Sequence, residues 1–380
     1  MDSQLNLIFN RKVAFLCGAA LLAVVFTLQY SFAYIGYGKP FVDPNIGYIM
    51  SVIPVLYLIF GYLFTRFASS LFLPVRVPVA FTLFCGHFLL FGGFFVKFML
   101  NDLPMLEISS YRVNTLISVS FVFYSVYFAA TQRFFLVLFF MLVLSIWIGV
   151  TGSGRIQFLY FTAGLVLLGA SSGLFRSQRF FLVLGLCAVV FVVASLVLSS
   201  ERQNLPLLAV LEDIWSRIQT ITLGRIGQIE ILDGLIRLDR YTSGETAWGL
   251  ATCLLDSSLC WGVDIGQSIG VVDRANYNQT GIGPGVFGTF YLWFKDWSVI
   301  VFPLVFLSLL LLMFRLRIAS VVCVAFFPIL AHVTEDYFNA WSSIVVWYIS
   351  ISVVVTFIWR VALILGIMKY ELSFNQIDAS

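Results

Sequence analysis

Charged residues are scarce in this sequence. Asp, Glu, Lys and Arg together make up 11% of the 380 residues, whereas 61% are hydrophobic and 17% are aromatic. Because a soluble globular domain carries about 25% charged residues, the composition excludes an ordinary soluble protein. The formal net charge is only +3, and nothing in the distribution of the basic residues indicates nucleic-acid binding.

Signatures of nucleotide and metal binding are also missing. No Gly-rich phosphate-binding loop of the Walker or dinucleotide type occurs, and the chain has only two histidines. His332, Glu335 and Asp336 could together hold a metal ion, but one histidine beside two acids is a weak pattern for a metal site. We therefore expect neither a cofactor nor a metal.

Long apolar runs dominate what is present. Since a helix needs about 20 apolar residues to cross a bilayer, the sequence predicts an all-α polytopic membrane protein with about ten transmembrane helices. The first run has no early cleavage pattern, which favours a retained span over a signal peptide. The ten predicted spans are residues 13–34, 46–64, 79–96, 113–130, 134–150, 156–174, 180–198, 297–314, 318–333 and 341–360.

The short loops predict the orientation. Arg and Lys gather in the loops on one side, among them "TQR", "RSQR" and "RLR", and short basic loops face the cytoplasm. Both termini are therefore predicted to lie inside. The chain divides into transmembrane helices 1–7 in residues 1–198, a large outer loop in residues 199–296, and helices 8–10 with a short cytoplasmic tail in residues 297–380.

The outer loop is far longer than a plain connection, and such loops are usually functional. Residues 205–221 carry an apolar stripe at helical spacing (Leu208, Leu211, Ile214, Ile218 and Ile221), which indicates a helix lying at the membrane surface. Further on, "VFGTFYLWF" predicts a half-helix that dips toward the membrane. Turn-rich backbone precedes it, and at membrane depth such backbone is tolerated only against protein or a watery cavity. We therefore expect this segment to form the wall of a cavity.

Six cysteines divide by location. Cys253 and Cys260 lie in the outer loop, where a disulfide is favoured if that face is oxidising; two buried thiols are the alternative. Cys17, Cys85, Cys187 and Cys323 lie within predicted spans, where we expect them to serve as small packing residues.

Arginine is the residue type that could bind an anion on the outer face. Arg155 follows the tight turn "TGSG" at the start of a span, where anion binding and simple anchoring at the membrane edge both fit. The loop adds Arg202, Arg217, Arg225, Arg237, Arg240 and Arg274, of which one or two are expected to bind a ligand and the rest to be solvated or paired. Arg274 is favoured because it adjoins the glycine-rich segment before the half-helix.

A possible base lies at the outer end of the ninth span. In "AHVTEDYF", His332, Glu335 and Asp336 occur at i, i+3 and i+4 and would share one helix face. His and Glu are common general bases, although a solvated helix end fits equally well. Aromatic residues of the loop could stack on sugars or lie in the interfacial belt: Tyr241, Trp248, Trp261 and Tyr277.

Two segments resemble a known family. "GIGPGVFGTFYLWFKDW" resembles the part of Wzy-type oligosaccharide repeat-unit polymerases in which a Gly/Pro/Ser turn leads into an aromatic helix ending in a Tyr-x-x-Phe pattern, here Tyr291 to Phe294. "TGSGRIQFL" is similar to the Gly/Ser-then-Arg start of a span in these polymerases and in the related O-antigen ligases. The family plan of ten or more spans with a large outer loop covers the whole chain. The sequence departs from the pattern at Lys295, where glycine is commoner.

The resemblance implies a GT-C-like inverting glycosyltransferase in the bacterial inner membrane, with its active site facing the periplasm. Its donor and acceptor substrates would both be undecaprenyl-pyrophosphate-linked oligosaccharides. The enzyme itself would contact membrane lipid and a possible chain-length regulator protein. Arg155 and Arg274, supported by Arg225, would bind the pyrophosphate, and His332 or Glu335 would act as base. Further substrate-binding candidates are Arg217, Arg240, Asp273, Tyr277, Asn278, Tyr291 and Asp336.

Three other functions compete with polymerisation. A ligase that transfers the polymer to a lipid A core would share the fold and the leaving group. A transporter would show ionisable residues or broken helices near the membrane midplane, and only His87 fits that description. A scaffold without turnover is the last alternative.

Overall fold

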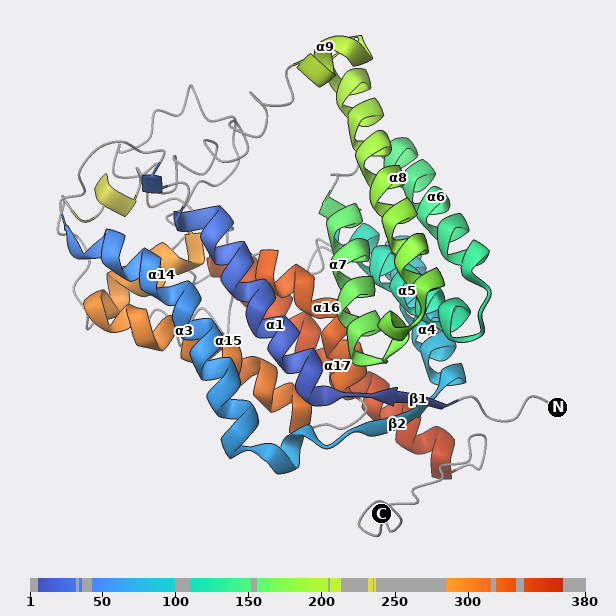
Figure 1. Ribbon diagram of the computed structural model, residues 1–380, viewed down its shortest axis with the longest axis horizontal. Coiled ribbons are helices and arrows are strands. Elements are labelled where there is room, and N and C mark those ends of the chain that lie inside the picture. The colour runs from blue at the N-terminus through green and yellow to red at the C-terminus, as the bar shows by residue number, and fades with distance from the viewer. Residues whose placement is uncertain are drawn as a thin grey trace.

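The computed structural model shows a helical protein (Figure 1). It describes residues 6–31, 34–35, 43–99, 110–151, 156–203, 206–212, 232–234, 236, 285–315, 319–332 and 338–364. Every predicted apolar run coincides with a helix. These helices are α1 (Arg11–Phe26), α3 (Asn45–Phe67), α4 (Val79–Met99), α5 (Ser110–Ala130), α6 (Phe134–Thr151), α7 (Ile156–Ser171), α8 (Gln178–Gln203), α15 (Ser298–Arg315), α16 (Ala319–His332) and α17 (Phe338–Ile364).

Among the described residues, four stretches are long and apolar enough to cross a membrane: Arg11–Ser31, Asn45–Phe67, Gln178–Leu198 and Gly285–Leu312. The remaining apolar helices are shorter. Apolar side chains are also exposed along α8, including Leu182 at 65% and Val189 at 59%. A helix that is apolar on its exposed side is stable in lipid rather than in water, so the structure is that of a membrane-embedded helical protein.

A small β-ribbon was not predicted. Strand β1 (Asn6–Phe9) pairs antiparallel with β2 (Val75–Pro78), with Leu7 opposite Val77 and Phe9 opposite Val75. These four side chains are buried, whereas Ile8 is exposed. The ribbon comes directly before α1 and α4, and it holds the starts of these two helices together. Its two strands are only four residues long, too short for alternation to separate them from the neighbouring apolar runs.

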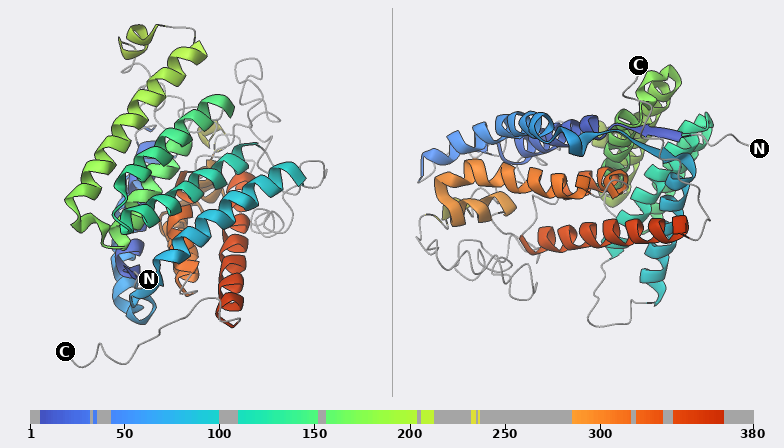
Figure 2. Two further views of the ribbon diagram at one scale, coloured as in Figure 1. Left: turned by 90° about the vertical axis from the view of Figure 1, so that its right-hand side faces the viewer. Right: turned by 90° about the horizontal axis from the view of Figure 1, so that it is seen from below.

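Helix α1 lies in the middle of the bundle and contacts α3, α7, α15 and α16. The views in Figure 2 show α1, α3 and α15 running side by side, with α4 to α8 grouped on the other side of the molecule. Glycine allows the closest approaches: a Cβ on Gly61 of α3 would lie 2.7 Å from the Cβ of Ala19, and one on Gly18 would lie 3.1 Å from the side chains of Leu310 and Phe327. Small residues bring helix backbones together where apolar burial between helices contributes little.

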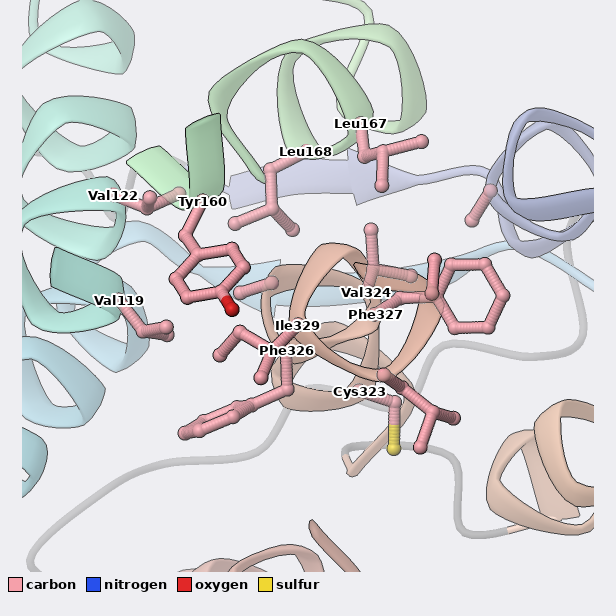
Figure 3. Close-up of a cluster of buried hydrophobic side chains, with 14 of the residues drawn as sticks. Val119, Val122, Tyr160, Leu167, Leu168, Cys323, Val324, Phe326, Phe327 and Ile329 are labelled. Atoms are coloured by element: carbon pink, nitrogen blue, oxygen red, sulfur yellow. The ribbon is translucent and has the colours of Figure 1, made fainter. Parts of the chain in front are cut away.

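The two groups of helices meet where α5, α7 and α16 pack against one another. A Cβ on Gly164 of α7 would lie 3.1 Å from Val122 of α5 and 3.4 Å from the carbonyl oxygen of Ala325 in α16. Figure 3 shows the buried side chains of this junction, with Tyr160 of α7 projecting toward Val119 and Ile329. We call this region the three-helix junction.

The predictions for the intramembrane polar residues are confirmed. Cys85, Cys187 and Cys323 are buried and unbridged, as expected of packing residues, and Cys17 is half-buried. The Sγ of Cys323 lies 3.3 Å from the Oγ of Ser352. His87 is exposed and hydrogen-bonded to its own helix: its Nδ1 lies 2.9 Å from the carbonyl oxygen of Leu83, and its ring contacts Tyr124 edge-on.

Candidate functional site

Two of the predicted site residues fall within the described part of the chain. Tyr291 lies in α14 (Gly285–Phe294), and His332 is the last residue of α16. The other predicted site residues lie outside the described residues and stay predictions: Arg155, Arg217, Arg225, Arg240, Asp273, Arg274, Tyr277, Asn278, Glu335 and Asp336, with Cys253 and Cys260.

Helix α14 is the half-helix that the sequence predicts. It is separated from α15 by a single 3₁₀ turn, Lys295–Trp297. The rings of Phe287 in α14 and Phe302 in α15 are 5.6 Å apart, whereas fifteen residues of straight helix would separate them by about 22 Å. The chain therefore reverses direction, and α14 packs back along the first turns of α15. The apolar stretch Gly285–Leu312 is consequently not one straight helix but two helices joined by a turn.

The reversal depends on the backbone of Lys295. Its φ is +49°, in the left-handed region that side chains other than glycine rarely adopt. Glycine is the residue that takes such a φ without strain. Lys295, Asp296 and Trp297 are all exposed at the tip of the hairpin.

Aromatic packing fixes α14 in place. The ring of Phe287 lies 5.3 Å from that of Phe26 in α1 and 5.3 Å from that of Tyr30 in the turn after α1, and Phe290 lies 5.2 Å from Phe302 of α15. Most of these pairs are edge-on, the geometry that ring quadrupoles favour. Seven of the ten residues of α14 are buried, as expected of a helix that is apolar all round. α14 is thus packed within the bundle rather than lying on its surface.

One polar contact joins α14 to the start of α3. The hydroxyl of Tyr291 donates a hydrogen bond to a carboxylate oxygen of Asp43, and the Tyr291 side chain is fully buried. The other carboxylate oxygen of Asp43 accepts from the backbone N–H of Asn45 at 2.9 Å. The structure thus gives Tyr291 a positioning role for α14, while its role in substrate binding stays a prediction.

Sequence reasoning missed Asp43. Asp followed by Pro is a recognised start signal for a helix, and "DPN" could have marked the beginning of α3. Its pairing with Tyr291, however, joins residues 248 positions apart, and no local pattern predicts such a contact.

A shallow apolar groove of about 280 Å³ lies between α1 and α3. It is lined by Ala23, Val24, Thr27, Leu28, Pro54, Val55 and Leu58. Two irregularities adjoin it, because α1 continues into a π-helical turn at Thr27–Ser31 and α3 contains Pro54. π-helical turns often occur at functional sites, and this groove could hold an apolar chain.

Helix α14 and the contact between Tyr291 and Asp43 lie at one end of the bundle, which we call the α14 end. α15 begins there, and α16, which follows after residues 316–318 and packs against α15, ends there at His332. The possible base and the half-helix thus lie at the same end. Within the described part of the chain, no group of three His, Cys, Asp or Glu side chains is placed to hold a metal ion.

Comparison with models of protein families, with curated proteins and with solved structures finds no match for this chain.

For the outer loop, the structure describes only a few residues. The short helix α9 (Leu207–Glu212) begins where the surface helix is predicted, but Val210 is buried and Leu208 of the predicted stripe is 73% exposed. The apolar stripe therefore does not pack on the protein at this position, and its remaining part lies outside the described residues. Leu232 and Asp233 are buried, and Leu232 belongs to the main core, so the middle of the loop is attached to the bundle.

Proposed function

We propose that this protein is a membrane glycosyltransferase that polymerises undecaprenyl-pyrophosphate-linked oligosaccharide repeat units. In this proposal it has ten spans in a GT-C-like arrangement in the bacterial inner membrane, with both termini in the cytoplasm and the α14 end facing the periplasm. The observation that carries the proposal is α14. The segment on which the family resemblance rests folds as a buried aromatic helix that turns back onto α15.

The proposed reaction joins two lipid-linked sugars. A hydroxyl oxygen of the acceptor attacks the anomeric carbon of the donor chain, the bond from that carbon to pyrophosphate breaks, and the base accepts the hydroxyl proton. Arg155 and Arg274, supported by Arg225, stabilise the charge that develops on the leaving pyrophosphate. His332 or Glu335 acts as the base. No nucleotide is needed, because the pyrophosphate linkage already activates the donor.

The position of α14 supports a site for an anion. The first N–H groups of a helix have no partner within it, and the helix dipole favours negative charge beside them. α14 begins at Gly285, only eleven positions after Arg274 in the sequence. An arginine and a helix N-terminus would then meet the same pyrophosphate.

The groove between α1 and α3 supports a lipid-linked substrate. It is lined almost entirely by apolar side chains, several of which are exposed, including Val24, Leu28 and Val55. An isoprenoid tail in this groove would leave the pyrophosphate at the α14 end.

The test is polymerisation of purified lipid-linked repeats by arginine variants. Arg155→Ala and Arg274→Ala should each lower the rate about a hundredfold, because a contact made mainly in the transition state is lost. Arg→Lys should restore little activity, since an ammonium group cannot bind two phosphate oxygens as the guanidinium does. Arg237→Ala is the control and should cost little, with the membrane level of each variant checked. Near-normal rates for both alanine variants would refute the pyrophosphate site.

The base and the acceptor are tested separately. His332→Ala should remove one limb of the pH–rate profile if His332 is the base; an unchanged profile would assign that role to Glu335 or Asp336, or to no residue. Deletion of the gene, followed by gel analysis of surface glycans, separates the two transferases. A single repeat retained on the core indicates a polymerase, whereas loss of all repeats indicates a ligase.

A further inference from the structure

Gln157 of α7 is fully buried, and neither its Oε1 nor its Nε2 has a hydrogen-bond partner among the residues that the structure describes. A buried amide without partners destabilises the fold by its full desolvation cost, and unpaired buried groups of this kind are rare in native proteins. A methionine or leucine would fill the same space without that cost. Packing alone therefore gives no reason for glutamine at this position.

The helix register places Gln157 at the α14 end. Gly164 lies against Val122 of α5 and Ala325 of α16. One level nearer the α14 end, Tyr160 projects toward Val119 and Ile329 (Figure 3). Residue 157 lies two helical turns from residue 164 in α7. Thr115 lies equally far from Val122 in α5, and His332 lies equally far from Ala325 in α16.

The three positions therefore share one level at the end of the three-helix junction. Thr115 is buried there, and His332 is the last residue of α16. Gln157 is the second residue of α7 (Ile156–Ser171), and it follows Arg155 by two positions in the sequence. A buried amide without partners thus lies beside residues that the proposed function places at the reaction.

We propose that Gln157 is a sugar-binding residue, whose side-chain amide hydrogen-bonds hydroxyl groups of the acceptor oligosaccharide. The identity of this ligand rests on the proposed function. Its chemistry follows from the amide itself, because Oε1 only accepts and Nε2 only donates. A phosphate only accepts, and a cation would engage only Oε1, so either would leave half of the amide unpaired. Neighbouring sugar hydroxyls can donate to Oε1 and accept from Nε2 together.

Binding requires a movement, since the amide is closed off from solvent in this structure. The unpaired amide raises the free energy of the closed state, and this cost is removed when a sugar hydroxyl hydrogen-bonds to the amide. A sugar therefore shifts the equilibrium toward an opened junction, whereas a ligand without hydroxyl groups has no such preference.

The test compares Gln157→Met, which keeps the size and removes the polar atoms, with Thr162→Val. Thr162 lies on the same helix, and its hydroxyl is likewise buried without a partner, but five residues of helix turn it to a different face. Gln157→Met should lower kcat/KM for the acceptor roughly tenfold at saturating donor. It should unfold in detergent at the same or a higher temperature than the wild type. Thr162→Val should leave the acceptor kinetics unchanged.

Each other outcome decides the matter. Unchanged acceptor kinetics for Gln157→Met would overturn the proposal while leaving the polymerase function intact. A clearly lower unfolding temperature would assign the amide to the fold and overturn the proposal as well. If the wild type polymerises nothing, the proposed function fails, and Gln157 is then judged by thermal shift with the free oligosaccharide repeat. A shift in the wild type that Gln157→Met loses supports sugar binding, and no shift in the wild type refutes it.

Discussion

At the scale of single residues, the contact between Tyr291 and Asp43 positions the candidate site. Tyr291 is the first residue of the Tyr-x-x-Phe segment that ends at Phe294, and its hydrogen bond to Asp43 ties α14 to the start of α3. Phe294 ends the pattern, and its ring lies 5.8 Å from that of Phe290 within the same helix. The first residue of the pattern thus anchors α14 through a hydrogen bond, and the last packs against the aromatic face of the helix.

Tyr291→Phe should destabilise the protein by about 1.5–3 kcal/mol, because the Asp43 carboxylate loses a buried donor. Thermal unfolding in detergent measures this change. The double variant with Asp43→Ala should be less destabilised than the sum of the single variants, since each alone already breaks the contact. Tyr62→Phe is the control, because that side chain is 54% exposed. Strict additivity would show that the contact contributes nothing to stability.

At the scale of elements, the hairpin of α14 and α15 is the feature that the candidate site depends on. Its reversal needs a left-handed residue, and its closing contacts are the aromatic pairs around Phe302. If the helix continued straight through Lys295 without this turn, α14 would lie in line with α15 and outside the bundle. The backbone at Lys295 therefore decides where the half-helix lies.

Replacing Lys295 separates backbone strain from side-chain effects. Lys295→Gly should leave the unfolding temperature unchanged or slightly raise it, because relief of the left-handed strain offsets the greater freedom of the unfolded chain. Lys295→Val should destabilise by about 1–2 kcal/mol, since a β-branched residue fits this φ poorly. Lys12→Val serves as the comparison, because Lys12 is an exposed lysine within the right-handed helix α1. Equal effects of valine at both positions would contradict the role of φ at Lys295.

At the scale of the whole molecule, the helices form two groups that meet at the three-helix junction (Figure 2). One group carries α14 and the apolar groove, and the other carries α7 with Gln157. The candidate site therefore lies where the two groups join.

The orientation of the whole molecule can be tested by labelling. A single cysteine at Ser216 should react with an impermeant thiol reagent added to intact cells, whereas one at Ser177 should react only after the membrane is opened. The expectation follows from the basic short loops, which the positive-inside rule places in the cytoplasm. A cysteine-free background removes interference from Cys253 and Cys260, whose disulfide stays a prediction. The opposite labelling pattern would place the α14 end in the cytoplasm and refute the periplasmic site.

The sequence by itself determined where the helices are. Each predicted apolar run, from residues 13–34 to residues 341–360, coincides with a helix, and the half-helix before Lys295 is present. The reason is that these runs are local: a long apolar stretch can satisfy its backbone polar groups only by forming a helix. The predictions that the cysteines of the apolar runs pack and that His87 is hydrogen-bonded were correct for the same reason. Residues of these types within apolar helices pack against neighbours or bond to their own helix.

Only the tertiary structure decided how these helices assemble. The pairing of β1 with β2, the reversal at Lys295, the bond from Tyr291 to Asp43 and the unpaired amide of Gln157 depend on residues distant in sequence. Apolar periodicity shows that a face will be buried, but not against which partner, since most apolar helices fit one another about equally well. Close contacts at Gly61 and Gly164, and a few polar pairs, select the arrangement because their geometry admits few alternatives.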